Sequence, residues 1–184
     1  MKNKIIIIDM VNGFVKEGPL HDKSILDIVD NINTVVEKID GDIIIFEDCH
    51  KPGCKEFEVF PEHCLEGDSQ SETIDELQYL FSHPNYLCTI KKNSTNGIFQ
   101  FIGRELAKPG RYYIMGVCSD ICVLQFAMSL KTLSNEMNTD IDVIVVSDAI
   151  DTFDGKNHDK NEMNQLAIDL MKSMGIKIIT SQEV

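Results

Sequence analysis

The chain has 184 residues, a length suited to one domain with a substantial core, and we expect residues 1–184 to form a single domain. With 17 basic and 30 acidic residues it carries a formal charge of -13, which would repel nucleic acid and anionic membranes, so we expect neither as a partner. No apolar run could cross a bilayer, and MKNKIIIIDMVNGF at the N-terminus lacks the apolar length and cleavage site of a secretory signal, so we expect a cytoplasmic protein with reduced cysteines.

Short runs of β-branched residues alternate along the chain with longer segments of helical spacing. The strand candidates are residues 4–9, 42–48, 86–91, 111–117, 142–148 and 176–180. Most are continuously apolar, as strands covered on both faces are. No glycine-rich nucleotide-binding motif follows any of them. This order predicts a three-layer α/β/α Rossmann-like fold with a mostly parallel sheet of about six strands.

Amphipathic helices are expected between these strands, each with one apolar face turned toward the sheet. The inward residues predicted for three of them are Ile25, Ile28, Val29, Ile32, Val36 and Ile39, then Val123, Phe126, Ala127, Leu130 and Leu133 after Asp120, and finally Met163, Leu166, Ala167, Leu170, Met171 and Met174.

Three strand ends carry an acid, a lysine and a cysteine. Ligands of open parallel sheets bind beyond the carboxyl ends of the strands. Asp9 ends the first strand, Lys91 and Lys92 end the third, and Cys122 follows the fourth in GVCSDICV. Taken singly, these residues are more often a helix cap, a solvated lysine pair and a small buried hydrophobe. Their convergence at one edge favours catalysis.

The residue types suit attack by a thiolate on a carbonyl group. We expect Cys122 at a helix N-terminus, where the dipole and Lys92 would lower its pKa. Asp9 could take the thiol proton and return it to a leaving amine. Backbone N–H groups of the turn, those of Cys118 and Cys122, could form an oxyanion hole. The C-x-x-x-C spacing does not match a redox pair or a zinc knuckle.

The irregular stretch from about residue 49 to 71 offers metal ligands. Asp48 and His50 can face the same way from an extended strand end, and His63 could return from the loop. An oxygen and nitrogen donor set of this kind suits a divalent ion such as zinc, iron or manganese. A solvated loop without metal is the ordinary alternative. We assign no role to Cys49, Cys54, Cys64 and Cys88.

The motifs resemble those of the isochorismatase-like cysteine hydrolases over about residues 4–180. IIIIDMVNGF is similar to the opening strand of that superfamily, GVCSDICV to its nucleophile turn, IKKNSTNGIF to its lysine strand and VVSDAIDT to a later strand end. The resemblance implies a triad of Asp9, Lys92 and Cys122, with Lys91 as the weaker lysine candidate, and a cis peptide between Val117 and Cys118.

The loop resembles that of the nicotinamidase and pyrazinamidase branch. Asp48 and His50 match its D-x-H motif, and FPEH ends in His63 as the branch's aromatic-Pro-x-His segment does. The resemblance implies one divalent metal, zinc first, on Asp48, His50 and His63, with Glu56 as a fourth candidate. It also implies that Phe14 and Phe60 sandwich a pyridine ring. Glu62 and Lys51 depart from the branch's usual proline and aromatic residue.

The leading hypothesis is therefore a nicotinamidase, which hydrolyses nicotinamide to nicotinate and ammonia in NAD salvage through a cysteine thioester. One alternative is another amide hydrolase of the superfamily, acting on a different small carboxamide or ureido substrate. A second, of another class, is a non-catalytic binding module with the same fold. Relatives commonly form dimers or larger assemblies, so a homo-oligomer is a further expectation.

Overall fold

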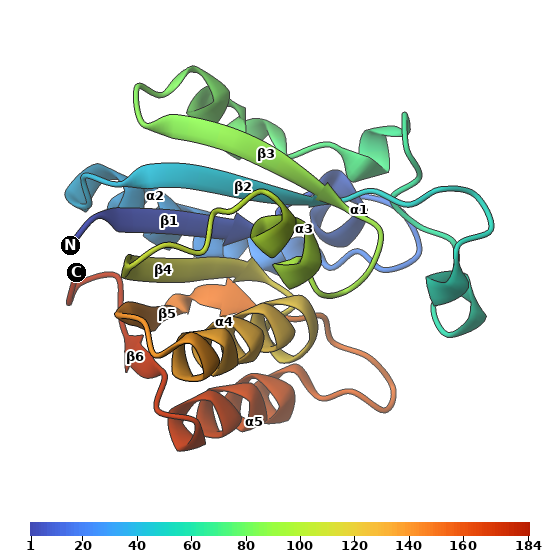
Figure 1. The fold of residues 1–184 in the computed structure, drawn as a ribbon. Coiled ribbons are helices and arrows are strands. Elements are labelled where there is room, and N and C mark those ends of the chain that lie inside the picture. The colour runs from blue at the N-terminus through green and yellow to red at the C-terminus, as the bar shows by residue number, and fades with distance from the viewer.

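The computed structural model describes all residues 1–184, which form a six-stranded sheet with helices on both faces (Figure 1). The strands are β1 (Asn3–Ile8), β2 (Asp42–Asp48), β3 (Tyr86–Lys92), β4 (Gly110–Val117), β5 (Ile141–Asp151) and β6 (Lys177–Ile179). Their order is β3-β2-β1-β4-β5-β6, and every pair of neighbours is parallel. The predicted α/β fold with a parallel sheet is confirmed.

Two apolar layers, one on each face of the sheet, form the core. In β1, Ile5 and Ile7 point into one layer while Ile6 and Ile8 point into the other, and all four are buried. A strand covered on both faces has no solvent side, which explains why it is apolar at consecutive positions.

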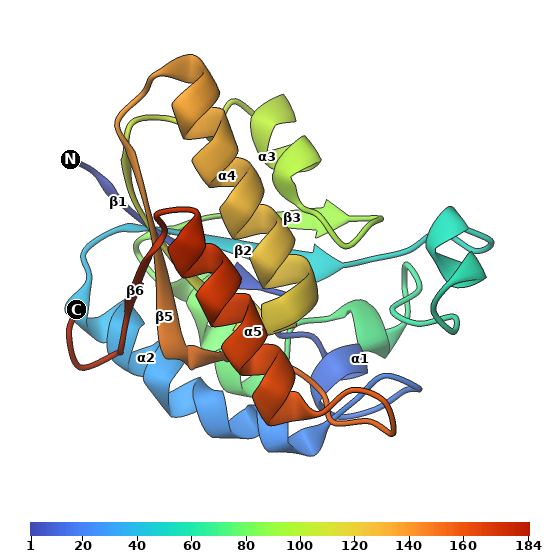
Figure 2. The ribbon, with the colours of Figure 1, turned by 90° about the horizontal axis from the view of Figure 1, so that it is seen from below.

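Helices α1 (Asn12–Val15) and α2 (Val29–Lys38) pack on one face of the sheet, and α3 (Ile98–Gly103), α4 (Leu124–Met137) and α5 (Lys160–Ser173) on the other (Figure 2). A π-helical turn, Ser119–Val123, leads into α4. The remaining helical segments are short 3-10 helices at Lys23–Ile28, Lys55–Glu58, Ser69–Ser71 and Asp75–Ser82. None of these helices has the length and apolar character needed to span a membrane.

The predicted helix over residues 25–39 is present with its apolar face buried, but residues 23–28 are 3-10 helical and only Val29–Lys38 is α-helical. The apolar face predicted for α5 is partly wrong. Ala167 and Met171 are buried, whereas Leu166, Leu170 and Met174 are 50%, 40% and 38% exposed. This helix lies beside α4, and Ala167 and Met171 are its buried residues (Figure 2).

The strand order determines where the candidate site forms. From β1 the chain adds β2 and β3 on one side of the sheet, and from β4 it adds β5 and β6 on the other side. The direction of the crossovers therefore reverses between β1 and β4, and the carboxyl ends of these two strands flank this point. Loops leaving two neighbouring strands at such a point diverge to opposite faces of the sheet and leave a crevice between them. The ends of β2 and β3 lie next to it.

Candidate active site

Lys92 lies between two buried carboxylates at the carboxyl edge of the sheet. In the register of β2 and β3, Lys92 is the partner of Asp48, and Asp9 follows directly after β1. The Lys92 Nζ atom is 2.7 Å from Asp48 Oδ1 and 2.8 Å from Asp9 Oδ2. All three side chains are at most 1% exposed, so water screens these ion pairs little.

The Asp9 carboxyl is completely buried, and its backbone has a positive φ of 52°. Aspartate tolerates this left-handed conformation better than most residues. Burial raises the pKa of Asp9 to about 7, although Lys92 acts in the opposite direction. Its Oδ1 atom accepts no N–H or O–H hydrogen bond. Near neutral pH, Asp9 can therefore both accept and donate a proton.

The structure distinguishes the two candidate lysines. Lys91 is exposed, and Lys92 points into the site. Burial alone would lower the pKa of Lys92, but the charges of Asp48 and Asp9 outweigh burial and raise this pKa well above its usual value. Lys92 is therefore a permanent cation in the site.

Cys122 lies in the π-helical turn with its sulfur 3.8 Å from Lys92 Nζ. Its side chain is buried, and burial raises the pKa of the thiol well above its ordinary value although Lys92 lowers it. The expected net lowering of this pKa is therefore wrong, because desolvation of the thiolate outweighs the charge of Lys92. The resting thiol is neutral, and a base must take its proton during attack.

The peptide bond between Val117 and Cys118 is cis. Just before it, Gly116 has a φ of 110°, and a Cβ atom there would lie 2.0 Å from the Ile8 carbonyl oxygen, so only glycine fits at this position. The backbone N–H of Cys118 donates to no acceptor in the structure. Such an unpaired donor, at the turn that carries Cys122, is what an oxyanion hole needs.

The four predicted metal ligands converge beside Lys92. Ligand atoms of Asp48, His50, Glu56 and His63 all lie within 4.8 Å of one another. The Nε2 atoms of His50 and His63 are 2.8 and 3.1 Å from Asp48 Oδ2, and Glu56 Oε1 is 3.6 Å from His50 Nε2. Two imidazoles and two carboxylates held this close form a donor set that suits zinc, iron or manganese.

Other contacts hold these ligands in place. His63 Nδ1 is 2.7 Å from the Pro61 carbonyl oxygen, which directs Nε2 toward Asp48. Glu56 Oε2 accepts a 2.9 Å hydrogen bond from the backbone N–H of Thr95, which joins the 3-10 helix Lys55–Glu58 to the segment after β3. Burial would raise the pKa of Asp48, but Lys92 and the two histidines hold it well below its usual range.

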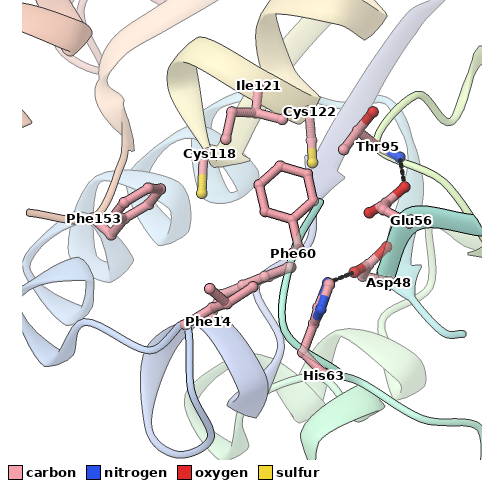
Figure 3. Close-up of a pocket in the computed structure, with 11 residues that line it drawn as sticks. Phe14, Asp48, Glu56, Phe60, His63, Thr95, Cys118, Ile121, Cys122 and Phe153 are labelled. Atoms are coloured by element: carbon pink, nitrogen blue, oxygen red, sulfur yellow. Dashed lines mark hydrogen bonds and ion pairs between the residues drawn. The ribbon is translucent and has the colours of Figure 1, made fainter. Parts of the chain in front are cut away.

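A pocket that is partly open to solvent joins the nucleophile to the candidate metal ligands (Figure 3). Its lining residues are Phe14, Leu20, Asp48, Glu56, Phe60, His63, Thr95, Cys118, Ile121, Cys122 and Phe153. The two predicted aromatic residues are both among them. Phe14 and Phe60 have ring centroids 5.5 and 6.4 Å from that of His63, so they place flat apolar surface beside the ligand set.

Four lining residues were not predicted from the sequence: Leu20, Thr95, Ile121 and Phe153. Ile121 could have been found, because it precedes Cys122 in the same turn. Phe153 follows the strand-end motif VVSDAIDT, but no periodic pattern showed that the loop after β5 returns to Cys118. Leu20 and Thr95 lie on loops whose direction depends on tertiary contacts.

The family model of the isochorismatase domain matches residues 4–183. Nicotinamidase 1 from Arabidopsis thaliana is 22% identical over 96% of this chain and 84% of its own length. The pyrazinamidase of Pyrococcus horikoshii, solved in complex with zinc, has a TM-score of 0.74 at 22% identity, covering 98% of this chain and 99% of that one. The N-carbamoylsarcosine amidase of Thermoplasma acidophilum has a TM-score of 0.73 at 23% identity, covering 100% and 99%.

The family match spans nearly the whole chain, and the expected resemblance to isochorismatase-like hydrolases, including their nicotinamidase branch, is confirmed. The predicted residues Asp9, Lys92 and Cys122 lie together at the strand ends that the motifs indicated. This chain belongs to the isochorismatase domain family and is an isochorismatase-like hydrolase.

Proposed function

We propose that this chain is a metal-dependent nicotinamidase, which hydrolyses the primary amide of nicotinamide to nicotinate and ammonia through a thioester on Cys122. The observation that carries the proposal is the presence, in one pocket, of a buried thiol beside Lys92 and a cluster of metal ligands. Similarity to Nicotinamidase 1 of Arabidopsis thaliana and to a zinc-bound pyrazinamidase supports it.

The donor set Asp48, His50, His63 and Glu56 would hold the metal, because these residues supply nitrogen and oxygen ligands within 4.8 Å of one another. When bound, such an ion acts as a Lewis acid and offers a coordination position for a substrate nitrogen or water. Asp48 would also link this centre to the nucleophile, since its Oδ1 atom is 2.7 Å from Lys92 Nζ.

Attack begins when Asp9 takes the proton of the Cys122 thiol and the sulfur adds to the carboxamide carbon. A pKa of about 7 makes Asp9 a good acceptor near neutrality, and Lys92 stabilises the negative charge as it develops on sulfur. The carbonyl oxygen becomes an oxyanion, which the unpaired N–H of Cys118 would stabilise.

The intermediate collapses as the C–N bond breaks and Asp9 returns its proton to the leaving nitrogen, so ammonia departs and a thioester remains on Cys122. Asp9 then takes a proton from an attacking water, whose oxygen adds to the thioester carbon. Breakage of the C–S bond releases the carboxylic acid, and the sulfur recovers the proton from Asp9.

The pocket favours a neutral, flat amide over one that carries a carboxylate. Its aromatic residues Phe14, Phe60 and Phe153 offer ring surfaces, and no lysine or arginine is among the lining residues. Lys92 lies behind them, paired with two acids. A substrate with a free carboxylate, such as N-carbamoylsarcosine, would therefore find no lysine or arginine side chain on the pocket wall to bind that carboxylate.

Ammonia release from nicotinamide and from N-carbamoylsarcosine, measured side by side with purified protein, tests the proposal. We expect turnover of nicotinamide that a chelator abolishes and added zinc restores, with N-carbamoylsarcosine at least about 100-fold slower. The Cys122→Ala variant provides the background rate. Chelator-insensitive turnover of N-carbamoylsarcosine, or no release from nicotinamide by the zinc-loaded protein, would contradict the proposal.

A further inference from the structure

The aromatic ring of Phe153 forms one end of the pocket, beside Cys118 and on the side away from the candidate metal ligands (Figure 3). Phe153 follows directly after β5 and the buried Thr152. Across the pocket from it in Figure 3 are Asp48 and Glu56, with the Cys118 and Cys122 sulfurs between. The pocket therefore has a polar end, which carries the candidate metal ligands, and an apolar end.

The Phe153 ring is held against a histidine by an unusually close stack. The ring centroids of Phe153 and His158 are 3.9 Å apart, and the ring planes differ by only 8°. His158 Nδ1 is 2.9 Å from the Phe153 carbonyl oxygen. Residues 155 and 158 also exchange backbone hydrogen bonds of 2.9 and 3.1 Å, which close a tight turn in the chain between Phe153 and His158.

This turn is joined to the turn that carries the nucleophile. His158 Nε2 is 2.7 Å from Asp120 Oδ2, and Asp120 lies between Cys118 and Cys122 in the π-helical turn. The Asp120 side chain is 6% exposed and that of His158 is 18% exposed, so water competes little for this contact. Both nitrogens of the His158 ring lie next to oxygen atoms, which fixes its orientation and that of the ring stacked on it.

We infer that Phe153 determines specificity for the leaving group of the amide, and that His158 positions it. This inference rests on the proposed function. Consider a substrate whose ring lies near Asp48 and His63 and whose amide carbon lies at Cys122. Its carbonyl oxygen would then point toward Cys118, and its amide nitrogen would point toward the apolar end of the pocket. Phe153 closes this end, so a primary amide, which loses ammonia, fits there. An amide with an alkyl group on its nitrogen would collide with the ring.

The experiment compares nicotinamide with its amide N-methyl derivative on the zinc-loaded enzyme, as a ratio of kcat/KM values. Phe153→Ala should reduce the preference for nicotinamide by about tenfold or more, because a pocket discriminates one methyl group by roughly 10- to 200-fold. Phe153→Leu, which keeps most of the bulk, should retain most of the preference. Phe99→Ala removes a ring that is 68% exposed in α3 and should leave the ratio unchanged.

A double-mutant cycle tests the positioning role of His158. His158→Ala should reduce the preference by severalfold, and it should have no further effect in the Phe153→Ala background, because it acts only through that ring. A merely structural role would lower stability without changing the ratio. An unchanged ratio in Phe153→Ala, or equal effects of His158→Ala in both backgrounds, overturns the inference.

Binding to the Cys122→Ala protein separates this inference from the proposed function. Dissociation constants of the two amides, measured by calorimetry with and without Phe153→Ala, give the same comparison without turnover. If the intact enzyme releases no ammonia but the ratio of dissociation constants falls with Phe153→Ala, the proposed function fails, and the part of the inference that stands is the exclusion of N-substituted amides by Phe153. If the Cys122→Ala protein binds neither amide, the inference fails as well.

Discussion

The Nζ atom of Lys92 lies 3.8 Å from the sulfur of Cys122, inside a site where both side chains are buried. The cation is close enough to stabilise a thiolate, yet burial keeps the resting thiol neutral by raising its pKa. The nucleophile is therefore activated only when its proton moves, and Asp9, paired with the same lysine, is the group placed to accept that proton.

Replacement of Lys92 by methionine should damage both stability and catalysis. The change leaves Asp9 and Asp48 without their shared cation, and breaking a buried ion pair typically costs about 3–5 kcal/mol of folding free energy. Activity should fall at least about 100-fold, since the thiolate loses its electrostatic support. Denaturant unfolding and ammonia release measure the two effects. Lys91→Met, at an exposed position, is the matched control and should change stability by less than about 0.5 kcal/mol.

The pH dependence of kcat/KM should report the ionisation of Asp9. Only ionised Asp9 can accept the thiol proton, so activity should rise with pH through a midpoint of about 7 and level off above it. Ionisation of the Cys122 thiol does not affect activity in this pH range, because burial raises the pKa of that thiol well above its ordinary value. Asp9→Asn should lower the rate by roughly 10²–10⁴ and remove this step from the profile. A midpoint near pH 4 in the wild-type enzyme would show that burial does not raise the pKa of Asp9.

Cys54 should support the metal site through His50. Its sulfur is 3.5 Å from His50 Nδ1, the nitrogen that faces away from Asp48. Outer partners of ligand histidines commonly contribute 10- to 100-fold in metal affinity, so Cys54→Ala should weaken zinc binding by about tenfold while Cys54→Ser retains more of it. Competition with a chromophoric chelator measures this directly. Cys88→Ala in β3 is the control, and an equal loss there would exclude a specific role for Cys54.

Glu56 should contribute to metal affinity less than His63. Its Oε1 atom is 3.6 Å from His50 Nε2, and its Oε2 atom accepts the N–H of Thr95. Glu56→Gln keeps an acceptor for Thr95 but loses the charge, so we expect its zinc affinity to fall by about tenfold. The zinc affinity of His63→Ala should fall further. Equilibrium dialysis with zinc compares the two variants. Unchanged affinity in Glu56→Gln would mean that the ion has only three protein ligands.

The sequence predicted the positions of Asp9, Lys92 and Cys122 well, for a topological reason. Each lies at or soon after the carboxyl end of a strand of the parallel sheet, and parallel strands bring these ends to one edge whatever the loops do. Asp48 and His50 follow the same logic, because Asp48 is the last residue of β2 and His50 lies two residues beyond it. Identifying such positions requires only the strand pattern and the direction of the chain.

Features that depend on tertiary contacts could not be predicted in this way. Phe153 reaches the pocket because His158 and Asp120 hold its loop, and these contacts join residues up to 38 positions apart. The pKa of Cys122 depends on burial by the whole fold, which no local motif records. In α5, Leu166 and Leu170 share the apolar spacing of Met171, but they remain 50% and 40% exposed while Met171 is buried.

The central claim is that Cys122 forms a thioester with the acyl part of a flat, neutral amide. Mass spectrometry of acid-quenched reactions between zinc-loaded enzyme and nicotinamide tests it most directly. The account predicts a nicotinoyl group on the peptide that contains Cys122, and neither this adduct nor ammonia release from the Cys122→Ala protein. Release of ammonia at the full rate by Cys122→Ala, with no adduct at this position in the unaltered enzyme, would contradict it.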